Sequence, residues 1–241
     1  MTALSKTPAL EIAGLHAWYG ESHVLHGVDL SVQSGEVVSL LGRNGAGRTT
    51  TLRAIFGLTG ARKGSIRVDG VETIAMPTHR IAHLGLGYCP EERGIFASLT
   101  AEENLMLPPA LGVHGRIGMS LDEIYTMFPN LKTRAKSQGT RLSGGEQQML
   151  AVARILRTGA HVLLLDEISE GLAPVIVQTL ARMIRTLKAQ GYTIVMVEQN
   201  FRFAAPLADR FYVMEHGVIV ESFTSAELES KRQVLDELLG V

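Results

Sequence analysis

A short apolar segment that breaks into a glycine-rich loop constrains the fold of this 241-residue chain more than any other feature. Val37 to Leu41 is typical of a buried strand. The loop that follows is Gly42-Arg43-Asn44-Gly45-Ala46-Gly47-Arg48-Thr49-Thr50. Its spacing is that of a phosphate-binding P-loop, in which glycines let the backbone wrap a β-phosphate and a cation reaches the β and γ oxygens. The segment therefore predicts a strand, a phosphate-binding loop and a helix in succession.

One position in this loop departs from the P-loop pattern. Arg48 stands where the motif has a lysine, so a planar guanidinium with five donors replaces a compact ammonium on a flexible stem. The positive charge is kept, but its geometry changes. Thr49 follows and offers a hydroxyl to Mg²⁺. On this segment alone, a glycine-rich turn without any ligand is an alternative interpretation.

A second segment, Val162 to Asp166, favours the phosphate interpretation. Its apolar residues suit a central parallel strand covered on both faces, and Asp166 then lies at the carboxyl end, where open α/β sheets bind ligands. A carboxylate at this position can hold Mg²⁺ directly or through water. Glu167, the next residue, is the candidate to orient and polarise an attacking water.

A third segment predicts a helix start. It reads Leu142-Ser143-Gly144-Gly145-Glu146-Gln147-Gln148. A hydroxyl and two glycines at the start of a helix leave backbone N–H groups and the positive end of the helix dipole facing an anion, and the favoured ligand is a phosphate. With all three segments in this order, a core strand that merely ends in an acidic turn becomes a poor explanation.

Together the three segments resemble the ATP-binding cassette (ABC) ATPases, and the resemblance covers essentially the whole chain. The segment from Leu142 to Gln148 is specific to that family among P-loop proteins. A closer resemblance is to one ATPase subunit of importers for branched-chain and other hydrophobic amino acids. It rests on Pro90-Glu91, Ser143-Gly144-Gly145-Glu146-Gln147-Gln148-Met149-Leu150-Ala151, Gly171-Leu172-Ala173-Pro174 and Val197-Glu198-Gln199-Asn200.

The resemblance implies ATP and Mg²⁺ as ligands, and ATP hydrolysis coupled to transport. In the family, the segment Ser143 to Glu146 of one subunit closes over the nucleotide held by the P-loop of another, so we expect a dimer with an identical or a different cassette. It also implies contact with integral membrane permease subunits through the groove beside Glu91 and the helical lobe. A periplasmic binding protein would act indirectly. We therefore expect peripheral attachment to the cytoplasmic face of the inner membrane.

The resemblance also gives roles to single residues. Tyr19 matches the aromatic that stacks on adenine, with ordinary strand packing as the alternative, and Trp18 would point the opposite way and has no role. Glu91 stands where most relatives have a glutamine that reaches Mg²⁺ and the attacking water. Gln199 stands where most have a histidine that contacts the γ-phosphate. In the loop after Glu167, Ala173 replaces the usual aspartate and Ile168 the usual proline.

These positions define the expected site. For catalysis we predict Glu167, Gln199 and Arg48, and for the metal Thr49, Glu91 and Asp166. For the nucleotide we predict Tyr19, the P-loop residues 42–50 and the segment Ser143-Gly144-Gly145-Glu146. Because Arg48 keeps charge but changes reach, and Gln199 cannot carry charge, we expect firm ATP binding with slow hydrolysis in this chain's own site. A second, non-identical cassette would compensate.

The predicted architecture is one ABC ATPase domain over residues 1–241. Residues 1–88 and 161–241 should form an α/β core, with a mixed, mainly parallel sheet, flanking helices and an N-terminal antiparallel β region. Residues 89–160 should form a helical lobe, since Thr100…Glu103 and Ser120…Glu123 both fit the capping box that starts helices. Thr224…Glu227 should cap a last amphipathic helix that packs on the core rather than binding a partner. That helix would carry Leu228, Val234, Leu235 and Leu238.

Composition excludes several other classes. A net charge of −1 and a pI of about 6.7 show no overall bias toward nucleic acid or anionic lipid, so we expect no nucleic-acid partner. No stretch approaches the roughly eighteen apolar residues of a transmembrane helix, and residues 1–6 lack the apolar block of a secretion signal. We therefore expect a soluble cytoplasmic protein. Cys89 is the only cysteine, so no internal disulfide can form.

Several alternatives compete with this interpretation. A soluble cassette ATPase that acts on nucleic acid or ribosomes usually carries two cassettes or a long coiled-coil insertion, and neither is present. A P-loop kinase or GTPase does not require the segment from Leu142 to Gln148. Urea, amide or aromatic-acid importers would use a nearly identical ATPase, because other subunits choose the cargo. His23 and His26 lie three apart, but without a clustered second pair of ligands we expect ordinary histidines rather than a zinc site.

Overall fold

The computed structural model describes residues 7–108 and 117–239. Residues 1–6, in which we expect no secretion signal, and most of the Pro/Gly-rich stretch 108–118 lie outside the described residues. The strands are β1 (Leu10–Tyr19), β2 (Ser22–Val32), β3 (Val37–Gly42), β4 (Ala61–Val68), β5 (Val71–Glu72), β6 (Leu86–Cys89), β7 (Val162–Asp166), β8 (Thr193–Val197), β9 (Arg210–Glu215) and β10 (Val218–Thr224). The helices are α1 (Arg48–Ile55), α2 (Thr78–Ala82), α3 (Ala101–Met106), α4 (Leu121–Met127), α5 (Pro129–Thr133), α6 (Gly144–Leu156), α7 (Pro174–Ala189), α8 (Phe201–Ala204) and α9 (Arg232–Leu239), with 3₁₀ turns η1 (Gly139–Arg141) and η2 (Ser225–Glu227).

The strands form two sheets. The first is antiparallel, with the order β2-β1-β4-β5, and the second has the order β10-β9-β3-β8-β7-β6. In the second sheet, neighbours from β9 to β6 run parallel, while β10 is antiparallel to β9. The predicted α/β fold class, with its mainly parallel sheet and N-terminal antiparallel region, is confirmed.

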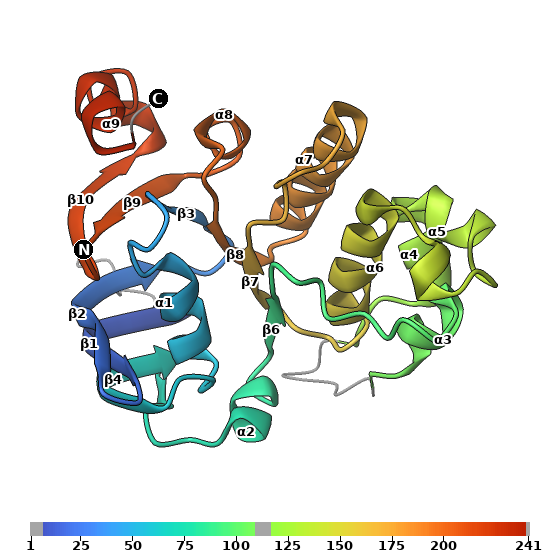
Figure 1. Ribbon diagram of the computed structural model, residues 1–241, viewed down its shortest axis with the longest axis horizontal. Coiled ribbons are helices and arrows are strands. Elements are labelled where there is room, and N and C mark those ends of the chain that lie inside the picture. Colours follow the sequence, from blue (N-terminus) through green and yellow to red (C-terminus); the bar gives the residue numbers. More distant parts are fainter. Residues whose placement is uncertain (1–6, 109–116, 240–241) are drawn as a thin grey trace, which may run out of the picture.

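Helix α1 lies between the two sheets, where it contacts β1, β2, β3 and β7 (Figure 1). Its residues Leu52 and Ile55 are fully buried in one hydrophobic cluster with residues of both sheets. This cluster fixes the loop before α1 against the carboxyl ends of β3 and β7. The candidate site therefore stands on rigid elements.

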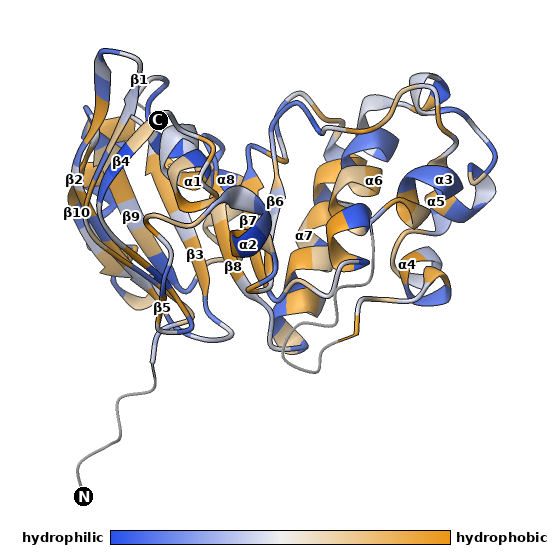
Figure 2. Ribbon diagram, turned by 90° about the horizontal axis from the view of Figure 1, so that it is seen from below, coloured by the Kyte–Doolittle hydropathy of each residue, from blue (hydrophilic) through white to orange (hydrophobic). Residues whose placement is uncertain are grey.

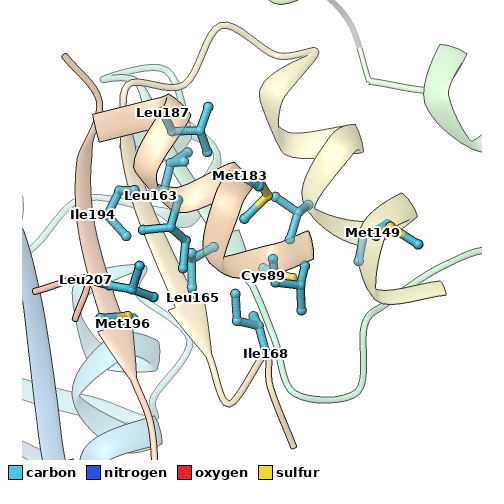
Figure 3. Packing of buried hydrophobic residues seen from close by; sticks show 14 of the residues in the cluster. Cys89, Met149, Leu163, Leu165, Ile168, Met183, Leu187, Ile194, Met196 and Leu207 are labelled. Carbon is cyan, nitrogen blue, oxygen red and sulfur yellow. The ribbon is translucent and has the colours of Figure 1, made fainter. Parts of the chain in front are cut away.

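The other face of the parallel sheet packs against α7. Leu163 and Leu165 on β7 and Met196 on β8 lie in one cluster with Met183 and Leu187 of α7 (Figure 3). Since successive strand residues point to opposite faces, the intervening residues of β7 belong to the cluster around α1 instead. The hydropathy colouring shows β3, β8, α6 and α7 as largely apolar (Figure 2). The prediction that β7 is a central strand covered on both faces is confirmed.

Helices α3, α4, α5 and α6 gather at one end of the molecule, with the antiparallel sheet at the other (Figure 1). Thr100 with Glu103 and Ser120 with Glu123 form the two predicted capping boxes, which start α3 and α4. The capping prediction for the last helix is wrong. Thr224 and Glu227 cap η2, and α9 begins only at Arg232.

The apolar face predicted for the C-terminal segment is confirmed only in part. Leu235 is 1% exposed and packs in the core, and Leu228 and Leu238 pack against the same cluster. Val234 is 36% exposed and therefore lies at the edge of the apolar face rather than in the core.

Among residues 7–108 and 117–239, no helix combines the length and the apolar character that crossing a membrane requires.

Candidate functional site

The glycine-rich loop joins β3 to α1, as its sequence predicts. Gly42 is required at the end of β3, because an added Cβ would collide with the backbone oxygen of Met214 on β9. The loop borders a cavity of about 390 Å³. Its lining includes Val24, Asn44, Gly45, Ala46, Gly47, Arg48, Thr49, Thr50, Glu91, Glu167, Glu170 and Gln199. The predicted loop residues Gly42 and Arg43 are not among them.

Arg48 lies at the centre of this cavity's polar contacts. Its Nη2 donates to Glu167 Oε1 at 2.8 Å and to Asn44 Oδ1 at 3.3 Å. The Arg48 side chain is only 4% exposed, yet its Nη1 is buried without a hydrogen-bond partner. Leaving a buried donor unpaired costs free energy, and more so when the group is charged. The free donor therefore suits an anionic oxygen of a ligand.

Gln199 reaches the same loop from the segment after β8. Its Nε2 donates to Asn44 Oδ1, so this one amide oxygen accepts from both Gln199 and Arg48. Two predicted catalytic residues thus meet at Asn44, which the sequence marked only as a loop residue.

Asp166 is held by two hydroxyl groups. Thr49 Oγ1 donates to Asp166 Oδ1 at 3.0 Å, and Tyr88 Oη donates to Asp166 Oδ2 at 3.0 Å. Burial raises the pKa of Asp166, and the two hydrogen bonds oppose that shift. Thr49 and Asp166 thus place two oxygen atoms side by side, and oxygen is the ligand atom that Mg²⁺ takes in proteins. Tyr88 was missed from the sequence, and its position in the strand just before Pro90 was the available signal.

Glu167 lies in a carboxylate cluster at the edge of the cavity. One carboxylate oxygen from each of Glu91, Glu167 and Glu170 lies within 4.8 Å of the others. Burial raises the pKa of Glu167 to about 7, with help from the hydrogen bond and the charge of Glu170, while the positive charge of Arg48 lowers it. Glu91, predicted as a metal ligand, therefore lies beside Glu167, the predicted general base. Sequence reasoning missed Glu170, three residues after Glu167.

A second buried carboxylate, Glu198, lies behind the cavity and was also missed. It is 1% exposed and accepts from the backbone N–H of Ser169 at 3.2 Å and from Ser169 Oγ at 2.7 Å. Burial raises the pKa of Glu198 to about 8, although these hydrogen bonds favour the ionised form. The side chain ties the loop after β7 to the end of β8. Its place between Val197 and Gln199 was the only hint in the sequence.

The segment Ser143 to Glu146 starts α6, as predicted. Ser143 is the N-cap, and its Oγ accepts from Glu146 N–H while Glu146 Oε2 accepts from Ser143 N–H. None of the cavity lining given above comes from this segment. The structure thus brings the P-loop, Glu167 and Gln199 together, but it leaves residues 143–146 apart from them.

Arg93 connects this helix start to the segment that follows Glu91. Its Nη1 donates to Gln147 Oε1 at 3.0 Å and its Nε to Gln148 Oε1 at 3.3 Å. The backbone of Arg93 has a left-handed φ of 66°, which is uncommon outside glycine. Sequence reasoning gave Arg93 no role.

Tyr19 ends β1 and is 38% exposed. It does not line the P-loop cavity. Ile168, at the position of the usual proline, is 1% exposed and packs in the core near Cys89 (Figure 3). This departure from the family pattern therefore serves packing.

The chain is similar in sequence to a known protein family and to several of its members. A family model described as ABC transporter matches residues 25–170. The high-affinity branched-chain amino acid transport ATP-binding protein BraG of Pseudomonas aeruginosa is 41% identical over 223 residues, which cover 92% of this chain and 96% of that protein. The probable branched-chain amino acid transport ATP-binding protein LivF of Archaeoglobus fulgidus is 34% identical over 220 residues, with 91% and 93% covered.

Solved structures agree on the fold. The crystal structure of a nucleotide-free ATP-binding cassette from an ABC transporter matches with a TM-score of 0.80 and covers 97% of this chain and 99% of its own. The two sequences are 21% identical, so this match bears on the fold alone.

Proposed function

The chain belongs to the ABC transporter ATPases, and from this premise we propose that it powers an importer for branched-chain or other hydrophobic amino acids. As a member of this family it binds nucleotide and hydrolyses ATP. The observation that supports the cargo class is its 41% identity, over nearly the full length of both proteins, to a branched-chain amino acid transport subunit. Permease subunits, a periplasmic binding protein and a place on the cytoplasmic face of the inner membrane belong to the same proposal.

The nucleotide phosphates should occupy the P-loop cavity. Arg48 has a buried donor with no partner there, and residues 44–50 line the cavity. A phosphate oxygen would satisfy that donor with a charge-assisted hydrogen bond. Tyr19, at the end of β1 beside α1, remains our candidate for the adenine contact.

The residues that would hold Mg²⁺ are Thr49 and Asp166, with Glu91 on the same cavity. Their oxygen donors fit a hard divalent cation. When bound, Mg²⁺ neutralises charge on the transferred phosphoryl group. The hydroxyl groups of Thr49 and Tyr88 each donate to one oxygen of Asp166 and so fix the orientation of its carboxylate.

Hydrolysis requires Glu167 to exchange partners. It now accepts from Arg48, and while it does so the same carboxylate oxygen is less available to a water. If Arg48 turns to a phosphate, Glu167 is freed to accept a proton from the attacking water. Gln199 can donate to the γ-phosphate after it releases Asn44, but its amide cannot take up a proton. These two exchanges underlie our proposal of firm binding with slow turnover.

Two cassettes should form one complete site. Residues 143–146 lie outside the P-loop cavity of their own chain, so the helix start they form is available to the nucleotide of a second cassette. We assign these residues to a helical lobe at 89–160, and the remaining segments 1–88 and 161–241 to the core. Within this lobe, Arg93 ties the segment after β6 to the start of α6 through Gln147 and Gln148.

A glutamine at position 167 tests the catalytic part of this proposal. Glu167→Gln keeps the size of the side chain but removes the base, and loss of a general base costs about 10²- to 10⁴-fold in turnover. We expect an ATP-bound dimer to accumulate in size-exclusion chromatography with light scattering, with Glu237→Gln as an exposed control. Undiminished phosphate release by Glu167→Gln would remove Glu167 from this role.

Uptake of labelled amino acids tests the cargo. In the native host, deletion of this chain should abolish high-affinity uptake of labelled leucine, and the intact chain should restore it. A copy with Asp166→Asn should not restore uptake. Normal leucine uptake in the deletion strain, together with loss of urea or amide uptake, would move the chain to another importer.

A further inference from the structure

Four aromatic side chains gather on the solvent side of the antiparallel sheet, and none of them is among the residues that line the P-loop cavity. His16 and Trp18 come from β1, and His23 and His26 from β2. The strand register pairs His16 with His26 and Trp18 with His23. Directly opposed residues of an antiparallel pair point to the same face, so the register places all four together. Spacing in the sequence did not reveal this group, because His16 belongs to a different strand.

Two imidazole nitrogens in this cluster are already at metal-ligand spacing. His16 Nδ1 lies 3.1 Å from His23 Nε2. Two nitrogens bound at about 2.0–2.1 Å to one tetrahedral Zn²⁺ would lie about 3.3 Å apart. The two nitrogens therefore need to separate by only a few tenths of an ångström, while each ring turns so that both lone pairs point at the ion instead of at each other.

We propose that His16 and His23 bind a divalent transition-metal ion, such as Zn²⁺, Ni²⁺ or Cu²⁺, on the outer face of β1 and β2. Both rings pack against aromatic neighbours. His23 stacks on Trp18 with centroids 4.2 Å apart and an angle of 9°, and it meets His26 in a T-shaped contact at 4.1 Å. His16 stacks on Trp18 with centroids 5.9 Å apart. His23 is exposed and His16 is half-buried, so water can complete the coordination. Imidazole nitrogen suits these metals, whereas Mg²⁺ prefers oxygen, which separates this site from the P-loop cavity.

One positive charge opposes this site. Lys63 of β4 pairs with His16 and is exposed on the same face. Its long stem lets the ammonium group remain in water, so repulsion from a bound cation is screened. Removal of Lys63 should tighten metal binding slightly or leave it unchanged.

Trp18 makes the site measurable, because it is the only tryptophan in the chain. A paramagnetic ion bound at His23 would lie beside the stacked indole and quench its fluorescence. Titration of the intact protein with Cu²⁺ or Ni²⁺ should give saturable quenching, with Cu²⁺ effective at lower concentration than Ni²⁺. Mg²⁺ should have no effect.

Variants decide between this site and unspecific quenching. Removing a residue that only hydrogen-bonds to a metal ligand already costs about 10- to 100-fold in metal affinity. His16→Gln and His23→Gln each remove a ligand itself, so each should raise the metal concentration at half-quenching by at least that factor. His83→Gln, at the end of α2, is the matched control and should leave the curve unchanged. A titration that stays linear to millimolar metal, or one that His16→Gln does not shift, would overturn the proposal. Unchanged thermal unfolding of each variant without metal verifies that it is folded.

Discussion

Arg48 and Glu167 form an ion pair on the P-loop cavity, with 2.8 Å between Arg48 Nη2 and Glu167 Oε1. The pair joins the cation of the P-loop to the carboxylate expected to activate water. In the mechanism that we propose, this contact must break before Arg48 can bind a phosphate and Glu167 can accept a proton from water. A shorter, more flexible lysine at position 48 would hold the carboxylate less rigidly, since a guanidinium forks in a fixed plane.

Arg48→Ala should weaken ATP binding by about 10- to 100-fold, because a hydrogen bond to a charged group contributes about 1.5–3 kcal/mol. Arg48→Lys should bind ATP about as well as the parent. Isothermal titration calorimetry with ATP and Mg²⁺ measures both. Arg80→Ala, an exposed arginine on α2, is the control. Equal affinity in Arg48→Ala and the parent would show that the phosphates lie elsewhere.

The pH dependence of ATP hydrolysis should follow Glu167. Burial raises its pKa to about 7, and only the ionised carboxylate can accept a proton from water. Thus kcat/KM should rise about tenfold per pH unit below that value and level off above it. Glu170→Gln should shift the rise to lower pH, because Glu170 is one of the groups that raise the pKa of Glu167. A flat profile from pH 6 to 8 would contradict this assignment.

The sequence predicted the parts of this site that depend on local pattern. The P-loop after β3, Asp166 after a fully apolar strand, and Ser143 at the start of α6 all follow from periodicity and capping chemistry, and the structure places them on those elements. Residues from distant segments could not be found in this way. Tyr88 reaches Asp166 only because β6 and β7 are adjacent and parallel.

Side-chain pairings were harder still to predict. The sequence identified Arg48 and Glu167 separately, but their contact joins residues 119 positions apart, and Glu167 makes it from a left-handed backbone with φ of 48°. The histidine cluster shows the same limit, since the spacing of His23 and His26 in the chain says nothing about His16 on the neighbouring strand. The predicted helix ends were also imprecise, because a capping box can start a 3₁₀ turn instead of an α-helix. The capping box of Thr224 starts η2 in this way.

Glu198 should make the folded state less stable as pH rises. Its pKa is raised from 4.5 to about 8 in the folded chain, so between these values the unfolded chain has lost a proton that the folded chain keeps. The free energy of unfolding contributed by this group is therefore fully present below pH 4.5 and is lost as pH approaches 8. Glu198→Gln should gain stability over the parent between pH 5 and pH 8, measured by urea unfolding. Glu229→Gln, which is exposed, should follow the parent at both pH values.

Gly145 should tolerate no larger residue, because α6 and α7 touch at this point. An added Cβ would lie 2.7 Å from Ile176 Cγ1 and 2.8 Å from Ile176 Cγ2. Overpacking of this kind costs about 1–3 kcal/mol, which exceeds the gain of about 0.5–1 kcal/mol that alanine brings to a helix. Gly145→Ala should therefore lower the free energy of unfolding in urea.

Two further variants separate this contact from a general effect of alanine in the segment. Gly144→Ala is the matched control, because its Cβ would meet only the end of the flexible Arg93 side chain, at 3.3 Å. Ile176→Ala makes room beside α6, so adding Gly145→Ala to it should stabilise the protein by the helix gain alone. If Gly145→Ala is equally destabilising in both backgrounds, the double-mutant cycle shows no coupling and the contact between α6 and α7 does not explain this glycine.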